Sequence, residues 1–167
     1  MIEEPPLLVA QSQFEPLLLE ASVTGLGTAL YGWLDLGVAA RLVRGRKMSD
    51  IHGLFDEFAA ALQFPLYFGE NGDAFNDCIT DLPYLFPNAG IAIVISEPDR
   101  IEFGILPWLV SALTRASKVW AAPIELGEWW DRPPVPFHVI LGGEADALDA
   151  AERLWTAAGA SLARLPN

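Results

Sequence analysis

The segment Gly90–Ser96 is the feature that most limits what this chain can fold into. It is a short, continuous apolar run rich in isoleucine, which is typical of a strand buried on both faces. Two further strands are expected at Arg41–Gly45 and Phe137–Leu141. Helical patterns separate the three strands, and this alternation indicates an α/β fold with a parallel sheet and right-handed crossovers.

Apolar residues spaced at i, i+3, i+4 and i+7 predict the helices. The expected helices span residues 49–62, 72–82 and 106–121, with a loop at residues 66–71. Ser49 and Asn71 are the candidate N-caps of the first two helices. Pro65 and Pro83 follow these helices, and proline disfavours helical geometry at the residue before it.

One hydrophobic core is expected, because 167 residues with 52% hydrophobic content suffice for one well-packed domain. The expected parts are an N-terminal extension packed on the core at residues 1–40, an α/β domain at residues 41–142, and a C-terminal segment at residues 143–167. In that last segment a helix is predicted over Glu144–Ala158, and residues 160–165 are a possible edge strand. The first 40 residues show no clean period.

The overall charge narrows the class of partner. The chain has 10 Lys and Arg residues against 22 Asp and Glu residues, and its net charge is -12. A basic surface for nucleic acid or anionic lipid is therefore not expected, whereas attraction to a basic protein is. No membrane segment is predicted, and the single cysteine, Cys78, favours a reducing compartment, with the cytoplasm as the default.

The predicted second helix has an acidic face opposite its apolar stripe. That face carries Asp73, Asn76, Asp77, Thr80 and Asp81. Asp73 and Asp77 stand one turn apart, and like charges at this spacing typically cost about 0.2–0.5 kcal/mol in an isolated helix. The face is either an ordinary solvated surface or a binding surface. The preceding loop favours binding, because Tyr67 and Phe68 put aromatic groups beside the carboxylates.

The run from Pro65 to Cys78, Pro-Leu-Tyr-Phe-Gly-Glu-Asn-Gly-Asp-Ala-Phe-Asn-Asp-Cys, closely resembles the loop and second helix of the barstar family. Ser49-Asp50-Ile51-His52 is similar to the start of that family's first helix, and the resemblance covers residues 41–142. It implies a three-stranded parallel sheet flanked by helices, and an intracellular inhibitor that blocks the active site of a basic ribonuclease or nuclease toxin.

The resemblance also implies which residues bind the partner. They are Tyr67, Phe68, Gly69, Asn71, Gly72, Asp73, Asn76, Asp77, Thr80 and Asp81. By position, Tyr67 would stack on a basic or imidazole group of the enzyme, and Asn71 would contact the enzyme from the loop. Asp73 and Asp77 would receive the enzyme's phosphate-binding arginines, in charge-assisted contacts.

Two positions depart from the family pattern. Asn76 stands where the family has a tryptophan, and an ungapped alignment puts Arg115 where the family has a glutamate that meets an arginine of the enzyme. Arg115 would repel that arginine. We therefore expect a target other than the original ribonuclease.

The acidic pair on the predicted second helix is also compatible with other functions. Asp73 and Asp77 could instead serve a hydrolase or hold a divalent cation, or the acidic helix could belong to a scaffold protein. His52 and His138 lack ligand neighbours, so structural roles are expected and neither a metal site nor a cofactor is predicted. The loop at residues 122–136 carries Trp129 and Trp130, either as a partner-binding anchor or as a lid over the core.

Overall fold

A five-stranded parallel sheet forms the centre of the computed structural model, which describes residues 4–85 and 89–166. The strands are β1 Leu17–Glu20, β2 Val38–Arg44, β3 Gly90–Ser96, β4 Phe137–Gly143 and β5 Ala163–Arg164, in the spatial order β2-β3-β4-β1-β5. The helices are α1 Val23–Asp35, α2 Ile51–Leu62, α3 Gly72–Ile79, α4 Leu106–Ala121 and α5 Ala145–Ala157. The short 3-10 turns are η1 Pro6–Leu8, η2 Gly45–Lys47, η3 Pro83–Leu85 and η4 Pro98–Arg100.

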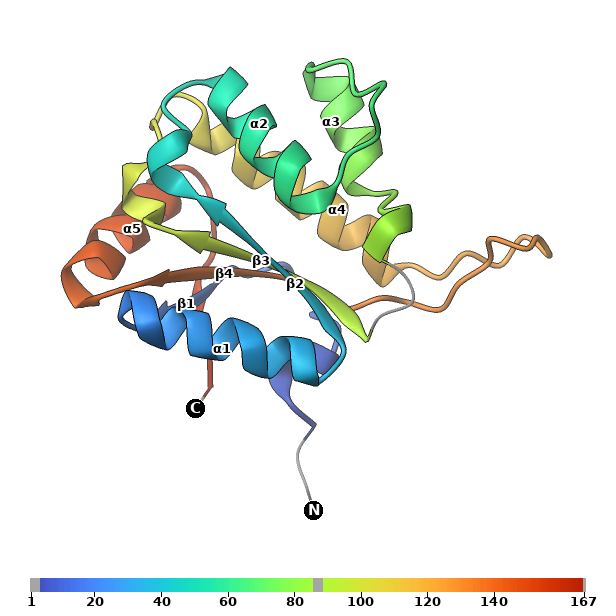
Figure 1. Ribbon diagram of the computed structural model, residues 1–167, viewed down its shortest axis with the longest axis horizontal. Helices are drawn as coiled ribbons and strands as arrows, with labels where there is room; N and C mark the ends of the chain where they lie inside the picture. Colours follow the sequence, from blue (N-terminus) through green and yellow to red (C-terminus); the bar gives the residue numbers. More distant parts are fainter. Residues whose placement is uncertain (1–3, 86–88, 167) are drawn as a thin grey trace.

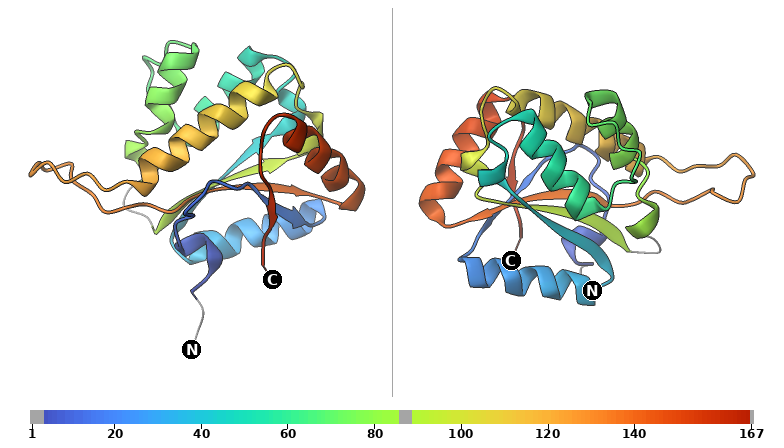
Figure 2. Two further views of the ribbon diagram at one scale, coloured as in Figure 1. Left: turned by 180° about the vertical axis from the view of Figure 1, so that it is seen from behind. Right: turned by 45° about the horizontal axis from the view of Figure 1, so that its top comes forward.

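Helices cover both faces of the sheet (Figure 1). α1 lies on one face together with η1, while α2, α4 and α5 cover the other, and α3 packs on the outside of α4 (Figure 2). In β3, Ile91 and Ile93 belong to the core on the α2 and α4 side, and Ala92 belongs to the core on the α1 side. The prediction of a strand buried on both faces is therefore confirmed.

The prediction of a three-stranded sheet is wrong, because both ends of the chain add a strand. β1 pairs with β4, and β5 pairs with β1 at the edge. A bare β4 would expose a row of unpaired backbone groups, and β1 satisfies them. The proposed edge strand at residues 160–165 is present as β5. The division of the chain into an N-terminal extension, an α/β domain and a C-terminal segment, with boundaries after residues 40 and 142, stays a prediction.

The ends of two helices differ from the sequence-based prediction. Asp50 caps α2, not Ser49, and its side chain accepts a hydrogen bond from the Gly53 amide at 2.8 Å. α3 ends at Ile79, three residues earlier than predicted. An aspartate at a helix C-terminus is opposed by the helix dipole, and this favours an end before Asp81. Asp81 therefore lies beyond the helix, although it remains exposed.

Residues 122–136, called the arm below, connect α4 to β4 and project from the body of the protein (Figure 1). The loop lies on the surface, as its composition predicts. The interpretation of its tryptophans as a lid is wrong, because 89% of Trp129 and 47% of Trp130 are exposed. Within the described residues, no helix is long and apolar enough to cross a membrane.

Candidate partner-binding surface

Aromatic packing under α3 fixes the direction in which its acidic face points. Phe75 is fully buried, and its ring centroid lies 5.2 Å from those of both Phe58 in α2 and Trp108 in α4. Cys78 and Ile79 are buried on the same side of the helix. With one face held by α2 and α4, the opposite face of α3 is turned toward solvent.

The carboxylates on and after α3 are exposed and unpaired. Asp73, Asp77 and Asp81 all lie on the surface. Over residues 4–85 and 89–166, the ion pairs are those of Arg44 with Glu57 and of Arg46 and Arg100 with Glu97, so none of them neutralises α3. The exposure of Asp73 and Asp77 predicted from the helix period is therefore confirmed.

The loop before α3 divides its two aromatic residues between surface and core. Tyr67 is 85% exposed, whereas Phe68 is partly buried against the rings of Phe55 and Phe64 at 5.7 and 5.1 Å. Only Tyr67 therefore presents an open ring beside the carboxylates. A role for Phe68 in partner binding stays a prediction, and in the free protein its ring holds the loop to α2.

Asn71 organises the start of α3. Its side-chain oxygen accepts a hydrogen bond from the Ala74 amide at 2.9 Å, so the predicted N-cap is confirmed. Its amide nitrogen donates to the Gly69 carbonyl at 3.3 Å. Gly72 lies against the Trp108 indole, where an added Cβ would come within 3.5 Å of the ring. These residues set the path of the loop whether or not they contact a partner.

Thr80 and Asn76 lie at the inner border of the acidic face. The Thr80 hydroxyl donates to the backbone carbonyls of Asn76 and Asp77 at 2.9 and 3.1 Å, which closes the last turn of α3. The side-chain oxygen of Asn76 is buried without a hydrogen-bond partner. A pocket of about 300 Å³ adjoins it, lined by Asn76, Trp108, Ser111, Ala112 and Arg115.

The fold thus brings together the two residues that depart from the family pattern. Asn76 and Arg115 come from different helices and line one pocket, and Arg115 is exposed there. Sequence reasoning named both residues but did not predict their contact with a common space, nor the presence of Ser111 in it. No local pattern signals such a pocket, because it depends on how α3 packs against α4.

The surroundings of Cys78 disfavour a reactive thiolate. Burial raises the pKa of its thiol, and the nearby carboxylates of Asp77 and Asp81 raise the pKa further. A thiol becomes a nucleophile when it is deprotonated, which these neighbours oppose. Its burial on the apolar side of α3 fits a packing role. In the described part of the chain, no group of three or more His, Cys, Asp and Glu residues could hold a metal ion.

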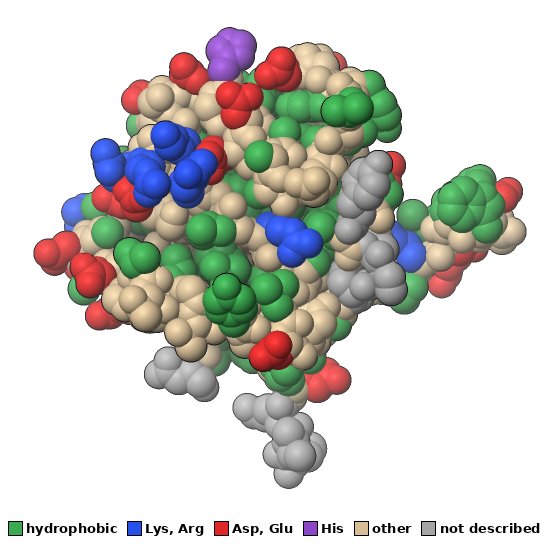
Figure 3. Space-filling view, in the orientation of Figure 1, with side chains coloured by type: hydrophobic (Ala, Val, Ile, Leu, Met, Phe, Trp, Pro, Cys, Tyr) green, Lys and Arg blue, Asp and Glu red, His purple; other side chains and the backbone are tan. Residues whose placement is uncertain are grey.

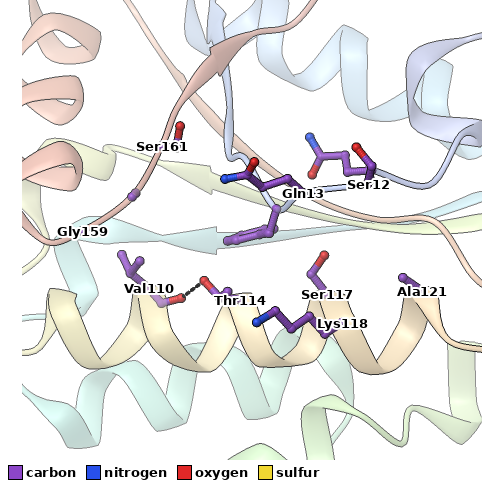
Figure 4. A pocket seen from close by; sticks show the side chains of 12 residues that line it. Ser12, Gln13, Val110, Thr114, Ser117, Lys118, Ala121, Gly159 and Ser161 are labelled. Carbon is purple, nitrogen blue, oxygen red and sulfur yellow. Dashed lines mark hydrogen bonds between the residues drawn. The ribbon is translucent and has the colours of Figure 1, made fainter.

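Two of the other cavities, both away from α3, have linings that could be considered as sites. One, of about 300 Å³, separates α4 from residues 11–14 and 159–161, and Lys118 is the only charged residue in its lining (Figure 4). The other, of about 570 Å³, lies between α1 and the carboxyl ends of β3 and β4. Arg44 and Arg46 at its border are already paired with glutamates. Neither cavity is lined by a group of unpaired charges like that on the exposed face of α3.

Gly142 has a packing role beside the second of these cavities. A Cβ at this position would lie 2.6 Å from a methyl carbon of Leu26, so the absence of a side chain lets α1 approach β4.

Comparisons with known proteins agree with the fold. The family model described as Barstar (barnase inhibitor) matches residues 38–142. No curated protein matches the chain. A solved structure that does match is the crystal structure of Cdc6p from Pyrobaculum aerophilum, with a TM-score of 0.53 and 15% sequence identity. The alignment covers 90% of this chain but only 38% of that one, and at this identity the similarity concerns the fold alone.

The family match includes every element that builds the candidate surface. It begins at the first residue of β2, ends within β4, and contains α2, the loop at residues 66–71, α3 and α4. It covers more than half of the 167 residues. The chain therefore belongs to the barstar, or barnase inhibitor, family.

Proposed function

We propose that this protein inhibits a basic ribonuclease or a related nuclease toxin by covering the active site of the enzyme with α3. The observation that carries the proposal is the exposed, unpaired pair of carboxylates at Asp73 and Asp77. A nuclease binds phosphates with arginine and lysine side chains. Carboxylates one helical turn apart offer these cations two anions on a rigid support.

The free protein is already arranged for such binding. No described ion pair has to break before Asp73 or Asp77 meets an arginine, and aromatic packing of Phe75 holds the helix in place. Arginine binds a carboxylate through two parallel hydrogen bonds, which fixes direction as well as charge. Tyr67 adds an exposed ring on which a guanidinium or imidazole group can stack.

The net charge of -12 supports a basic partner and fast association with it. We infer that the protein acts in the cytoplasm and is not itself an enzyme. General acid or base catalysis needs a carboxyl group with an altered pKa in a sheltered site, whereas Asp73 and Asp77 face open solvent. The cytoplasm suits a chain whose single cysteine is buried and unpaired.

The target that we propose differs from the original ribonuclease of the family. Arg115 is exposed beside Asn76, so the pocket between α3 and α4 presents a positive charge within a negative surface. An arginine of the enzyme at this point would be repelled. We expect the target to place a carboxylate or a neutral acceptor opposite Arg115.

A capture experiment with a charge-reversal variant tests the proposal. The full chain is immobilised, exposed to extract of the native host at low salt, and the bound proteins are assayed for nuclease activity with and without added protein. D73K/D77K is the test variant, and D149K/E152K on α5 makes the same change in charge at exposed positions away from α3. Circular dichroism verifies that both variants fold.

We expect the wild-type protein and D149K/E152K to retain and inhibit a nuclease, and D73K/D77K to do neither. If D73K/D77K captures and inhibits the same nuclease, α3 is not the inhibitory surface. If the captured proteins lack nuclease activity, the protein is a scaffold or binds another class of partner. Hydrolysis of RNA by the purified protein, abolished in D77N, would make it an enzyme.

A further inference from the structure

The tip of the arm is an exposed aromatic pair with acidic residues around it. The rings of Trp129 and Trp130 meet edge to face with centroids 5.4 Å apart, and the neighbouring Leu126 is also mostly exposed. Figure 3 shows apolar side chains gathered at this projection with acidic side chains beside them. Large exposed aromatic groups in one place mark interaction sites, because burying them on a partner is favourable.

Hydrogen bonds within the arm hold the tip in one shape. The Asp131 carboxylate accepts hydrogen bonds from the amides of Leu126 and Gly127 at 3.0 and 2.8 Å. Gly127 has a φ of +78°, which favours glycine at this point of the turn. Ile124 and Arg132 form an antiparallel bridge below it. A tip that is ordered before binding loses less entropy when it meets a partner.

The base of the arm is tied to the end of α3. The Arg132 guanidinium lies 4.7 Å from the centroid of the Trp120 ring and donates to the carbonyls of Val119 and Ala122 at 3.1 and 3.0 Å. The Trp120 indole nitrogen in turn donates to the Ile79 carbonyl, the last residue of α3, at 3.0 Å. In each ribbon view the arm projects from the end of the molecule where α3 lies (Figure 2).

The charges of the arm specify the chemistry of its partner. Glu125, Glu128 and Asp131 are exposed, and Arg132 is the only cation between residues 122 and 136. Arg132 is occupied by backbone carbonyls and the Trp120 ring. The tip therefore combines aromatic faces with negative charge, and this combination attracts lysine and arginine side chains through cation–π and ionic contacts. It repels anionic lipid and a second copy of this acidic chain.

We propose that the arm is a second binding site for the same basic nuclease, in which Trp129 and Trp130 hold a lysine or arginine side chain outside the active site. This inference rests on the proposed function. α3 would block the active site, while the arm would add affinity and select the partner without touching the catalytic groups. Trp120 and Arg132 tie the base of the arm to the end of α3, so both sites belong to one rigid body.

Binding kinetics of an arm variant test the inference. The nuclease captured by the full chain is immobilised, and W129A/W130A is compared with the wild-type protein and with D73K/D77K. We expect the dissociation constant to rise about tenfold for W129A/W130A, mainly through faster dissociation. Inhibition at saturating concentration should remain complete, because the arm does not occupy the active site. Y31A, which removes an exposed aromatic ring from α1, is the matched control and should bind like wild type.

The outcomes separate the two proposals. Unchanged affinity of W129A/W130A together with loss of binding in D73K/D77K overturns the arm inference and leaves the proposed function standing. Wild-type affinity and inhibition in D73K/D77K, or the absence of any nuclease bound by the wild-type chain, overturns both. Sedimentation that shows a dimer for the wild-type protein and a monomer for W129A/W130A would make the occupant a second copy. Binding of wild-type protein to anionic vesicles, lost in the variant, would make it a membrane. Either result overturns the inference.

Discussion

Replacing Asp77 by asparagine should stabilise the free protein, although it should weaken binding to the partner. Asp77 lies in the last turn of α3, where a negative charge opposes the helix dipole by about 0.3–1 kcal/mol. Its repulsion from Asp73 one turn earlier typically adds about 0.2–0.5 kcal/mol. Asparagine and aspartate have similar helix propensities. D77N should therefore raise the free energy of unfolding by about 0.5–1.5 kcal/mol at low ionic strength.

Urea unfolding followed by circular dichroism measures this change. The midpoint should rise for D77N at low salt with an unchanged m-value, and the difference should shrink in 1 M salt, because screening removes interactions between exposed charges. D73N is the matched control. Asp73 lies in the first turn, where its charge favours the helix, so D73N should leave stability unchanged or lower it slightly. If D77N instead lowers the free energy of unfolding by about 1 kcal/mol or more, the Asp77 carboxylate stabilises the fold. That result would refute the argument that its charge favours partner binding at the expense of stability.

Two further predictions concern the core. His138 is buried with its Nε2 atom 2.9 Å from the Val9 carbonyl, and burial lowers its pKa below the usual 6.5. The unfolded chain then binds the proton more readily, so stability is complete above about pH 6.5 and falls as the pH drops below it, by up to about 1.4 kcal/mol per pH unit. In urea unfolding between pH 8 and 5.5, H138Q should lack this pH dependence of stability. H52Q is the control, because His52 is exposed, and it should keep the pH dependence. G45A should destabilise the protein by about 2 kcal/mol or more in urea unfolding, because its Cβ would lie 2.0 Å from the Glu97 carbonyl oxygen. If G45A is as stable as the wild-type protein, the tight contact between η2 and the residue that follows β3 is contradicted.

The central part of the fold could be predicted because its signals are local. β3 and α4 have the predicted bounds, since a continuous apolar run and a regular helical stripe identify them without reference to the rest of the chain. β1 could not be predicted in this way. It has four residues, and its position in the sheet depends on pairing with β4, more than a hundred residues later. Pairing between distant segments leaves no periodic pattern of apolar residues in a strand this short.

The candidate surface shows the same limit. The helix period was enough to predict that Asp73 and Asp77 share an exposed face. The division of roles between Tyr67 and Phe68 depends on Phe55 and Phe64, and the pocket of Asn76 and Arg115 depends on the contact between α3 and α4. The composition of residues 122–136 predicts a loop, but it predicts neither the hydrogen bonds of Asp131 and Arg132 that shape the arm nor the exposure of its tryptophans.

The few cations of this chain leave the acidic face of α3 without ion pairs among the described residues, which fits the proposed function. Two carboxylates form ion pairs within the described residues: Glu57 with Arg44, and Glu97 with Arg46 and Arg100. Asp73, Asp77 and the acids of the arm have no such partner there, and neither do Asp149 and Glu152 on α5. Unpaired like charges one helical turn apart lower stability. Under the proposed function, a cationic partner offsets this cost for Asp73 and Asp77, and Arg115, exposed in the same region, would repel partners whose arginines face it.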